Sequence, residues 1–196
     1  DSILPIDTYK SDVDDIVKPE YKLDWSSLRK SIGTHGLRHS TLSAQMPSES
    51  SSVVSNATNG IEAPSGYLSI KKSKKGPLKQ IVPQYTTLKN HYSLLWELPS
   101  NEGYIKIVAV MQKFFDQAIS GNWSYNPTQY EDNEVPMSVM IQDMLNTYKY
   151  GWKTSYYQNT YDYKSDDDIE DETETVQLEL PQEELDDDEM CDACAI

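Results

Sequence analysis

The sequence predicts an α/β fold followed by an acidic tail, and three observations lead to this prediction. Stretches with apolar residues at helical spacing recur along residues 1–161. Short stretches with strand-like composition alternate with them, which is the order expected of α/β units. Residues 162–196 lack the apolar side chains that a core would need, so this segment is expected to be disordered.

The first third of the chain contains one clear helix. Residues 1–22 are expected to form an irregular lead-in. A helix follows, with Asp24 as its N-cap and Gly36 at its end. Residues 37–46 resemble a short strand, and residues 47–66 are rich in Ser, Asn, Gly and Pro, which indicates an unusually long loop.

The rest of the body is expected to hold a hairpin, three helices and two strands. The hairpin is centred on Lys74-Lys75-Gly76. Asn101 is a candidate cap for the second of the three helices, and Pro136 lies in the first turn of the third. By apolar spacing, the helices cover 87–98, 101–120 and 135–151, and the strands cover 121–126 and 153–160.

The negative charge belongs to the tail alone. Residues 162–196 hold 16 acidic residues and a single basic one, Lys164, so this segment carries the whole formal net charge of −15. Residues 1–161 are balanced, with 16 acidic and 16 basic residues. Acidity of this kind is typical of a solvated tail rather than of a binding face on the body.

Location is predicted from what the sequence does not contain. No apolar run approaches the roughly 20 residues that cross a bilayer. No N-terminal signal pattern is present either, so a cytoplasmic protein is expected. The first residue is Asp1 rather than Met, so the chain is expected to be processed or to be a piece of something longer.

The stretch "MPSESSS" (46–52) is the first candidate site. If a helix starts nearby, its positive end and the serine hydroxyls would form an anion pocket that needs no Lys or Arg. A flexible Ser-rich loop or an ordinary N-cap explains the same residues.

Tyr156 and Tyr157 are the second candidate site. Adjacent residues of a strand point to opposite faces, so ordinary sheet packing accounts for two neighbouring tyrosines. Redox chemistry is the alternative, because a phenol can release an electron and a proton together and a neighbouring phenol can pass the vacancy on.

Cys191 and Cys194, the only cysteines of the chain, are the third candidate site. A zinc site would need further ligands, for which His35 and His39 have a suitable spacing. A thioredoxin-like site would need a helix after the second cysteine, where only two residues follow. A prenylation motif would need Cys at position 193, where this chain has Ala193. A mobile dithiol remains, and a flexible tail would let it reach roughly 30 Å from the body.

These stretches occur together, and in this order, in the large (catalytic) subunit of class I ribonucleotide reductases. The chain resembles the C-terminal part of that subunit, in particular that of the enterobacterial and T-even-phage type. The similarity covers nearly the whole chain, and its strings are "LPIDTY" (4–9), "THGLRHSTLSAQMPSESSS" (34–52), "SNATNGIEAPSGYLSIK" (55–71), "LLWELP" (94–99), "GYIKIVAVMQKFFDQAIS" (103–120), "VPMSVMIQDMLNTYKYG" (135–151) and "KTSYYQNT" (153–160).

The resemblance implies a fold and a role for each candidate site. Residues 1–161 would be the last part of a ten-stranded α/β barrel made of two antiparallel half-barrels, and residues 162–196 a flexible tail with a redox-active cysteine pair. Tyr156 and Tyr157 would be the stacked pair that relays a radical, and Cys191 and Cys194 the pair that re-reduces an active-site disulfide. The substrate diphosphate would be bound by Ser48, Glu49, Ser50 and Ser51, where the family commonly has Thr in place of Ser50.

The resemblance also implies partners. The thiyl-forming cysteine, the disulfide cysteines and the ATP/dNTP effector sites of the family lie N-terminal to the matched region. This chain would therefore be a fragment or one half of a split subunit, inactive alone and completed by an N-terminal polypeptide. The radical would come from a di-iron small subunit, electrons from thioredoxin or glutaredoxin, and the substrate would be a ribonucleoside diphosphate. The resemblance implies that this chain holds no metal or cofactor of its own and contacts neither nucleic acid directly nor a membrane. For a phage protein, the location would be the host cytoplasm.

The tail differs from the enterobacterial pattern, which spaces its two cysteines more widely than the C-x-x-C found here. This difference bears on the choice of external reductant. An alternative from another class is a non-enzymatic module whose acidic tail binds a basic partner through a salt-sensitive contact.

Overall fold

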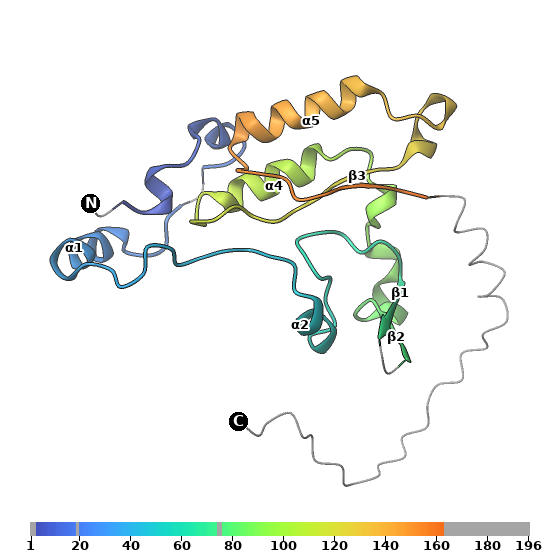
Figure 1. Ribbon diagram of the computed structural model, residues 1–196, viewed down its shortest axis with the longest axis horizontal. Helices are drawn as coiled ribbons and strands as arrows, with labels where there is room; N and C mark the ends of the chain where they lie inside the picture. The colour runs from blue at the N-terminus through green and yellow to red at the C-terminus, as the bar shows by residue number, and fades with distance from the viewer. Residues whose placement is uncertain (1–2, 19, 74–75, 163–196) are drawn as a thin grey trace, which may run out of the picture. The chain divides into compact units, whose positions relative to one another are not determined.

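The computed structural model describes residues 3–18, 20–73 and 76–162. Two units are distinguished in the chain, and the boundary between them falls after Tyr161. The predicted tail lies outside the described residues apart from Asp162, and the helices and strands of the described part belong to the first unit. The helices of this unit are α1 (Trp25–His35), α2 (Glu49–Val54), α3 (Tyr85–Leu88), α4 (Glu102–Gln112) and α5 (Met137–Tyr150). Its strands are β1 (Leu68–Ser73), β2 (Gly76–Ile81), β3 (Trp123–Tyr125) and β4 (Gln158–Thr160) (Figure 1).

A parallel strand pair with a crossover helix confirms the α/β prediction. β3 and β4 pair in parallel, with Trp123 opposite Gln158, and α5 forms the connection that such a pair requires. The segment 117–125 contains β3, and on its other side Gln45 forms a parallel bridge with Ile119. In Figure 1, α4 and α5 lie beside this sheet. The segment 117–125 therefore has parallel neighbours on both sides.

The core lies between α4, α5 and the lead-in. Its buried apolar residues are Val13, Ile105, Val108, Ala109, Ile119 and Trp152. The indole N–H of Trp152 donates to the carbonyl of Ile119 at 2.8 Å, so the largest core side chain also satisfies its polar atom. A core of this kind fixes the position of the segment that leads into β3.

The lead-in is more ordered than the sequence predicts. It contains two short 3₁₀ turns, η1 (Pro5–Asp7) and η2 (Ser11–Asp15). The buried ammonium of Lys113 pairs with Asp14 at 2.6 Å, and the hydroxyl of Tyr9 donates to the same carboxylate at 2.8 Å. A buried ion pair with an added hydrogen bond holds its two segments in one arrangement, so the lead-in is part of the body.

The first predicted helix is confirmed at both ends. The carboxylate of Asp24 accepts from the backbone N–H of Ser27 at 3.0 Å, as an N-cap does. Gly36 ends α1 with φ +74°. The antiparallel hairpin of β1 and β2 is also confirmed, with Leu68 opposite Ile81.

Two predicted helices are wrong in extent. Over 87–98 the chain forms α3 and two 3₁₀ turns, η3 (Lys89–His91) and η4 (Leu95–Glu97), instead of one helix. Distant carbonyls divert this segment: the N–H of Leu95 donates to Pro64, and the hydroxyl of Tyr92 donates to Pro83. The helix predicted over 101–120 ends at Gln112.

Side-chain hydrogen bonds explain why α4 stops early. The Gln112 amide donates to the carbonyls of Phe115 and Gln117 and accepts from the N–H of Ile119 at 3.0 Å. These bonds replace the helical pattern after the last turn. Asn101 precedes α4 but does not cap it with its side chain, which instead donates to Asp143.

Three further predictions change in detail. The loop predicted over 47–66 contains the short helix α2, with Ser48 as its N-cap residue. The strand predicted over 37–46 is reduced to the isolated bridge at Gln45. Pro136 is the N-cap residue of α5 rather than a residue of its first turn, and Gly151 ends this helix with φ +79°. Turns η5 (Pro127–Gln129) and η6 (Glu131–Asn133) connect β3 to α5.

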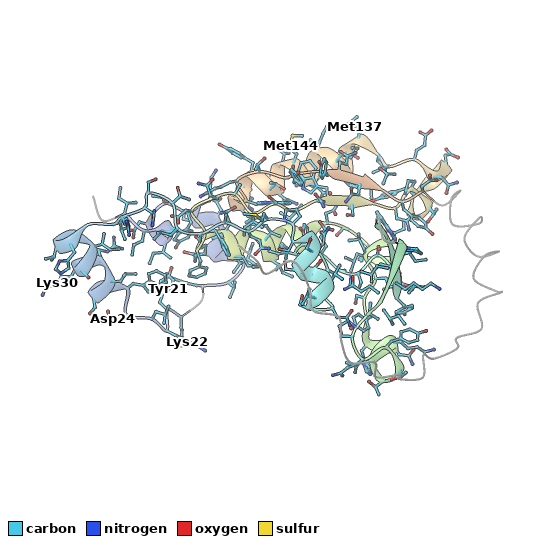
Figure 2. The ribbon with its side chains drawn as sticks, turned by 60° about the horizontal axis from the view of Figure 1, so that its bottom comes forward. Tyr21, Lys22, Asp24, Lys30, Met137 and Met144 are labelled. Carbon is cyan, nitrogen blue, oxygen red and sulfur yellow. The ribbon has the colours of Figure 1, made fainter. Side chains whose placement is uncertain are left out.

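One face of α5 is apolar and exposed. Figure 2 labels Met137 and Met144 on this helix, which are 67% and 58% exposed. Ile141, Leu145 and Tyr148 are also exposed. Within the described part of the chain, no helix is both long and apolar enough to span a membrane.

Candidate functional site

The predicted phosphate loop lies at the start of α2. Ser48 precedes the helix, and the N–H groups of residues 49–51 open it, where a helix offers no carbonyl partners of its own. Ser48, Ser50 and Ser51 are exposed. The positive end of a helix and three exposed hydroxyls are therefore close together, which is the arrangement that an anion requires.

Two contacts hold this loop in place. The N–H of Ser48 donates to the carbonyl of Asn59 at 2.6 Å, which closes the loop behind the helix. The amide of Gln80, on β2, donates to the carbonyls of Ser52 at 3.4 Å and Ala57 at 3.2 Å. The hairpin thus supports the end of α2, while the start of α2 stays open.

A cavity of about 440 Å³ lies beside the loop. It is lined by residues 56–60, 62–66 and 80–83 together with Ser69, Tyr92 and Leu95. None of the four predicted phosphate-binding residues lines it.

Tyr156 and Tyr157 come directly before β4, and their rings lie against each other. The ring centroids are 4.2 Å apart with planes at 55°, and the two hydroxyl oxygens are 3.5 Å apart. Both residues are more than half exposed. The expectation that they point to opposite faces of a strand is therefore wrong. Their role as a radical relay stays a prediction.

An extra residue in the strand explains why the rings meet. In a regular parallel ladder, a single residue donates to one carbonyl and accepts from the N–H two residues further along its neighbour. Here the two bonds are divided: Tyr156 donates to Gly121 at 2.8 Å, and Tyr157 accepts from Trp123 at 3.0 Å. Two residues thus oppose Asn122, as in a β-bulge, which interrupts the alternation of side chains.

The Tyr156 phenol is held in its neutral form. The hydrogen bond with Tyr157 raises the pKa of Tyr156 above its ordinary value of 10.0. At neutral pH this phenol therefore carries its proton. An electron can leave it easily only if the proton leaves with it.

One segment connects the two candidate sites. On one side, the N–H of Ser120 donates to the carbonyl of Gln45 at 2.9 Å, shortly before α2. On the other side, Gly121 accepts from Tyr156. Two ordinary strand spacings place the backbone segments that contain Gln45 and Tyr156 roughly 10 Å apart across the sheet. The phosphate loop and the tyrosine pair therefore flank the same strand.

The remaining predicted site residues cannot be placed. Cys191 and Cys194 lie outside the described residues, so the dithiol and the zinc alternative with His35 and His39 both stay untested. In residues 3–18, 20–73 and 76–162, no group of three or more His, Cys, Asp or Glu side chains is arranged to hold a metal ion.

A buried polar cluster supports the strand and was not predicted. The carboxylate of Asp143, on α5, accepts from the Asn101 amide at 2.9 Å and the Tyr125 hydroxyl at 3.0 Å, and all three residues are buried. Burial and the Asp143 charge raise the pKa of Tyr125. Ser124, on β3, donates its N–H to Asn101 at 2.9 Å. An aspartate on a helix is an ordinary surface signal, so no sequence pattern indicates that Asp143 is buried.

The family model of the ribonucleotide reductase barrel domain matches residues 1–158. This chain belongs to that family. The α/β body is therefore part of a reductase-type barrel, as the resemblance implied.

Curated relatives agree with the family match. The chain is 58% identical to ribonucleoside-diphosphate reductase 1 subunit alpha of Salmonella typhimurium and 57% identical to the protein of the same name from Escherichia coli, each over 164 residues. It is 46% identical over 172 residues to ribonucleoside-diphosphate reductase subunit alpha of enterobacteria phage T4.

Coverage is uneven between the two sides of these matches. They include 84%, 84% and 87% of this chain but only 22%, 22% and 23% of the relatives. The chain thus spans about a fifth of the length of the relatives that it matches. These relatives do not favour the alternative of a non-enzymatic binding module.

Proposed function

We propose that this chain acts as the C-terminal portion of the large subunit of a ribonucleoside-diphosphate reductase. It would supply the substrate-phosphate loop, the tyrosine relay and the shuttle dithiol for making deoxyribonucleoside diphosphates. Family membership supports the proposal, and the observation that carries it is the ring contact between Tyr156 and Tyr157, 4.2 Å between centroids. Exposed neighbouring phenols have no packing role that requires such contact.

The start of α2 would bind the substrate diphosphate. The N–H groups of residues 49–51 and the hydroxyls of Ser48, Ser50 and Ser51 would donate to phosphate oxygens, and the helix end adds partial positive charge. A site built from neutral donors binds the anion without a lysine or arginine. The Glu49 backbone takes part in the same way.

The tyrosine pair would carry the radical by coupled transfer. The O–H bond of one phenol breaks, its proton and electron move to the phenoxyl oxygen of the other, and a new O–H bond forms there. The hydroxyl oxygens are 3.5 Å apart, which suits such an exchange. No charge builds up, because proton and electron move together.

The dithiol would return electrons to the active site. A thiolate of Cys191 or Cys194 attacks the active-site disulfide and forms a mixed disulfide with one of its sulfurs. The other tail cysteine then attacks the tail sulfur of this mixed disulfide, which forms the tail disulfide and releases the active-site thiol. The active site gains two electrons and the tail becomes a disulfide, which thioredoxin or glutaredoxin reduces.

The chain would work only with other polypeptides. An N-terminal polypeptide would provide the thiyl-forming cysteine, the disulfide pair and the effector sites. A small subunit with a di-iron centre would provide the radical. The exposed apolar face of α5 supports contact with a further polypeptide. We place this assembly in the cytoplasm, or in the host cytoplasm for a phage protein.

Turnover in the assembled enzyme tests the proposal. The chain is mixed with the N-terminal polypeptide, small subunit, thioredoxin and a ribonucleoside diphosphate, and deoxynucleotide is measured. Tyr156→Phe and Tyr157→Phe are expected to abolish product while substrate binding is retained, because Phe has no O–H bond to break. Tyr67→Phe is the matched control, since Tyr67 forms another ring contact, with Tyr85 at 5.5 Å. Full turnover by either relay variant would reject the relay.

The dithiol is tested in the same assay by changing the reductant. Cys191→Ser and Cys194→Ser are expected to lose thioredoxin-driven turnover and to keep turnover driven by a small dithiol, which reaches the active site without the tail. If both variants keep thioredoxin-driven turnover, the shuttle role is wrong.

A further inference from the structure

The bulge at the tyrosine pair leaves one backbone donor without a ladder partner. Tyr156 takes the Gly121 carbonyl that a regular ladder would give to Tyr157. The N–H of Tyr157 donates instead to the side-chain oxygen of Asn122 at 3.0 Å. The position of the Tyr157 backbone therefore depends on a side chain, whereas that of Tyr156 depends on a backbone carbonyl.

Glu62 fixes the orientation of that side chain. The Asn122 amide nitrogen donates to the Glu62 carboxylate at 2.5 Å. An amide has one accepting end and one donating end. Flipping it would place its nitrogen against the Tyr157 N–H and its oxygen against the carboxylate, so both contacts would be lost. The two partners together permit a single orientation.

The surroundings of Glu62 strengthen this contact. Glu62 is partly buried, and burial raises the pKa of its carboxyl while the Asn122 hydrogen bond opposes the rise. The nearby Tyr104 phenol has its pKa raised to about 12 by burial and by the Glu62 charge. Glu62, Tyr104 and Asn122 all line one small cavity. A hydrogen bond to a partly buried carboxylate is stronger and more directional than one in water.

We propose that Glu62 and Asn122 are positioning residues for the tyrosine pair. Glu62 fixes the orientation of the Asn122 amide. Asn122 then accepts a hydrogen bond from the N–H of Tyr157, which has no backbone acceptor because of the bulge. As a result, the two phenol rings stay in contact. The role in catalysis rests on the proposed relay function, whereas the role in holding Tyr157 does not. Neither residue takes part in the electron transfer itself.

Four variants separate the two contacts. Asn122→Ala removes both. Asn122→Asp keeps an acceptor for Tyr157 but opposes the Glu62 carboxylate with a second one. Glu62→Gln keeps an acceptor oxygen for Asn122. The double variant Asn122→Asp with Glu62→Gln restores the hydrogen bond between the two side chains in the opposite direction. The amide introduced at position 62 can donate to the carboxylate introduced at position 122.

Amide hydrogen exchange on the full 196-residue chain gives the first readout. In Asn122→Ala, exchange of the Tyr157 amide is expected to accelerate about tenfold, since one hydrogen bond is lost. The Tyr156 amide, bonded to Gly121, is expected to change little. Asn126→Ala is the matched control: Asn126 lies at the other end of β3 and its side chain holds Thr128 and Trp96. Equal acceleration at both tyrosine amides, or the same pattern in Asn126→Ala, would overturn the proposal.

Turnover of the assembled enzyme gives the second readout. Asn122→Ala and Asn122→Asp are expected to lower kcat about 10²-fold with KM for the ribonucleoside diphosphate unchanged, because a small misplacement of a reacting group is costly. Glu62→Gln is expected to remain near the wild type, and the double variant to recover most of the loss of Asn122→Asp. A general loss of folding would not be repaired by a second substitution. Failure of the double variant to recover would overturn the proposal.

The two proposals can fail separately. If Tyr156→Phe and Tyr157→Phe turn over normally, the relay is rejected, and the exchange pattern still decides whether Asn122 holds Tyr157. If the relay variants are inactive but Asn122→Ala keeps full kcat, the relay stands and the positioning role is rejected.

Discussion

The two candidate sites rest on parts of the molecule that are held in different ways. The tyrosine pair adjoins β3, which is supported by the apolar core and by the buried Asp143 cluster. The phosphate loop adjoins the hairpin, where Leu68, Ile70, Leu78 and Ile81 are all at least 42% exposed. Among the described side chains of residues 48–81, only that of Ser52 is buried.

This difference fits the two proposed roles. Radical transfer between phenols tolerates little displacement, and a packed core keeps the backbone still. Binding a diphosphate through backbone N–H groups tolerates a support held by a few hydrogen bonds. The exposed apolar residues of the hairpin would gain partners from the rest of a barrel. The part around β3 should therefore unfold with the whole body, and the hairpin part should open locally.

Truncating the largest core side chain should give the largest effect. Trp152→Ala is expected to lower the free energy of unfolding by about 3–5 kcal/mol, because it leaves a cavity and removes the bond to Ile119. Ile70→Ala in the hairpin is the matched substitution, at a residue 52% exposed, with an expected cost of about 0.5 kcal/mol or less. Urea unfolding followed by fluorescence measures both. Similar losses for the two variants would contradict the comparison.

The next effect comes from the end of α5. Gly151 has φ +79°, and a Cβ added there would lie 2.5 Å from Cβ of Lys10. Gly151→Ala is therefore expected to cost about 1–3 kcal/mol through backbone strain, with the contact to the lead-in adding to it. Gly103→Ala in α4 is the control, since nothing lies within 4 Å of its added Cβ, and it should be neutral or stabilising by about 0.5–1 kcal/mol. In thermal unfolding, Gly151→Ala should lower the melting temperature, and Gly103→Ala should leave it unchanged or raise it.

The sequence predicts those elements whose ends are set by local chemistry. Asp24 and Gly36 bound α1 because a short acceptor and a residue free to adopt positive φ are needed there. Prediction from the sequence fails where groups far away along the chain determine the local backbone conformation. Leu95 donates to a carbonyl some thirty residues earlier, at Pro64, so a stretch with helical spacing does not form a helix.

The candidate site shows the same limit. The alternation rule places Tyr156 and Tyr157 on opposite faces, and the bulge that brings them together depends on Gly121 and Trp123 of another segment. Their identity as a pair came from the family resemblance. The ties through Asn122 and Glu62 join residues 60 positions apart, which no local pattern indicates.

A smaller and local effect is expected at the hairpin. Gln80→Ala removes the bonds to the carbonyls of Ser52 and Ala57 and should cost about 1 kcal/mol. The loss should appear as faster exchange of the Ala57 amide, which donates to Ser52 at 2.9 Å, with little change in global unfolding. Gln129→Ala is the control, because it removes a similar side-chain bond, to the carbonyl of Trp96, from the part around β3. A global loss equal to the local one would show that the hairpin does not open separately.

The smallest effect is expected from the exposed ion pair between the lead-in and α1. The two terminal guanidinium nitrogens of Arg29 donate to the two carboxylate oxygens of Asp7, at 2.6 and 2.7 Å. These bonds, followed by the N–H of Leu4, hold the pKa of Asp7 at about 2, below its ordinary value of 3.8. A lowered pKa in the folded state means that the stabilisation is present above pH 3.8 and is lost as the pH falls through about 2. Because the pair is exposed, salt should weaken it.

Asp7→Asn tests this contact by its dependence on pH. The melting temperature of the variant should be slightly below that of the wild type at about pH 6, and the difference should shrink between pH 3.8 and about pH 2, because the wild-type carboxylate becomes protonated there. Gly103→Ala, which changes no carboxylate, is the control and should show no such narrowing. A difference that persists unchanged at about pH 2 would contradict this account, because the bonds from Arg29 and from the N–H of Leu4 both favour the charged carboxylate and should both weaken when it is protonated.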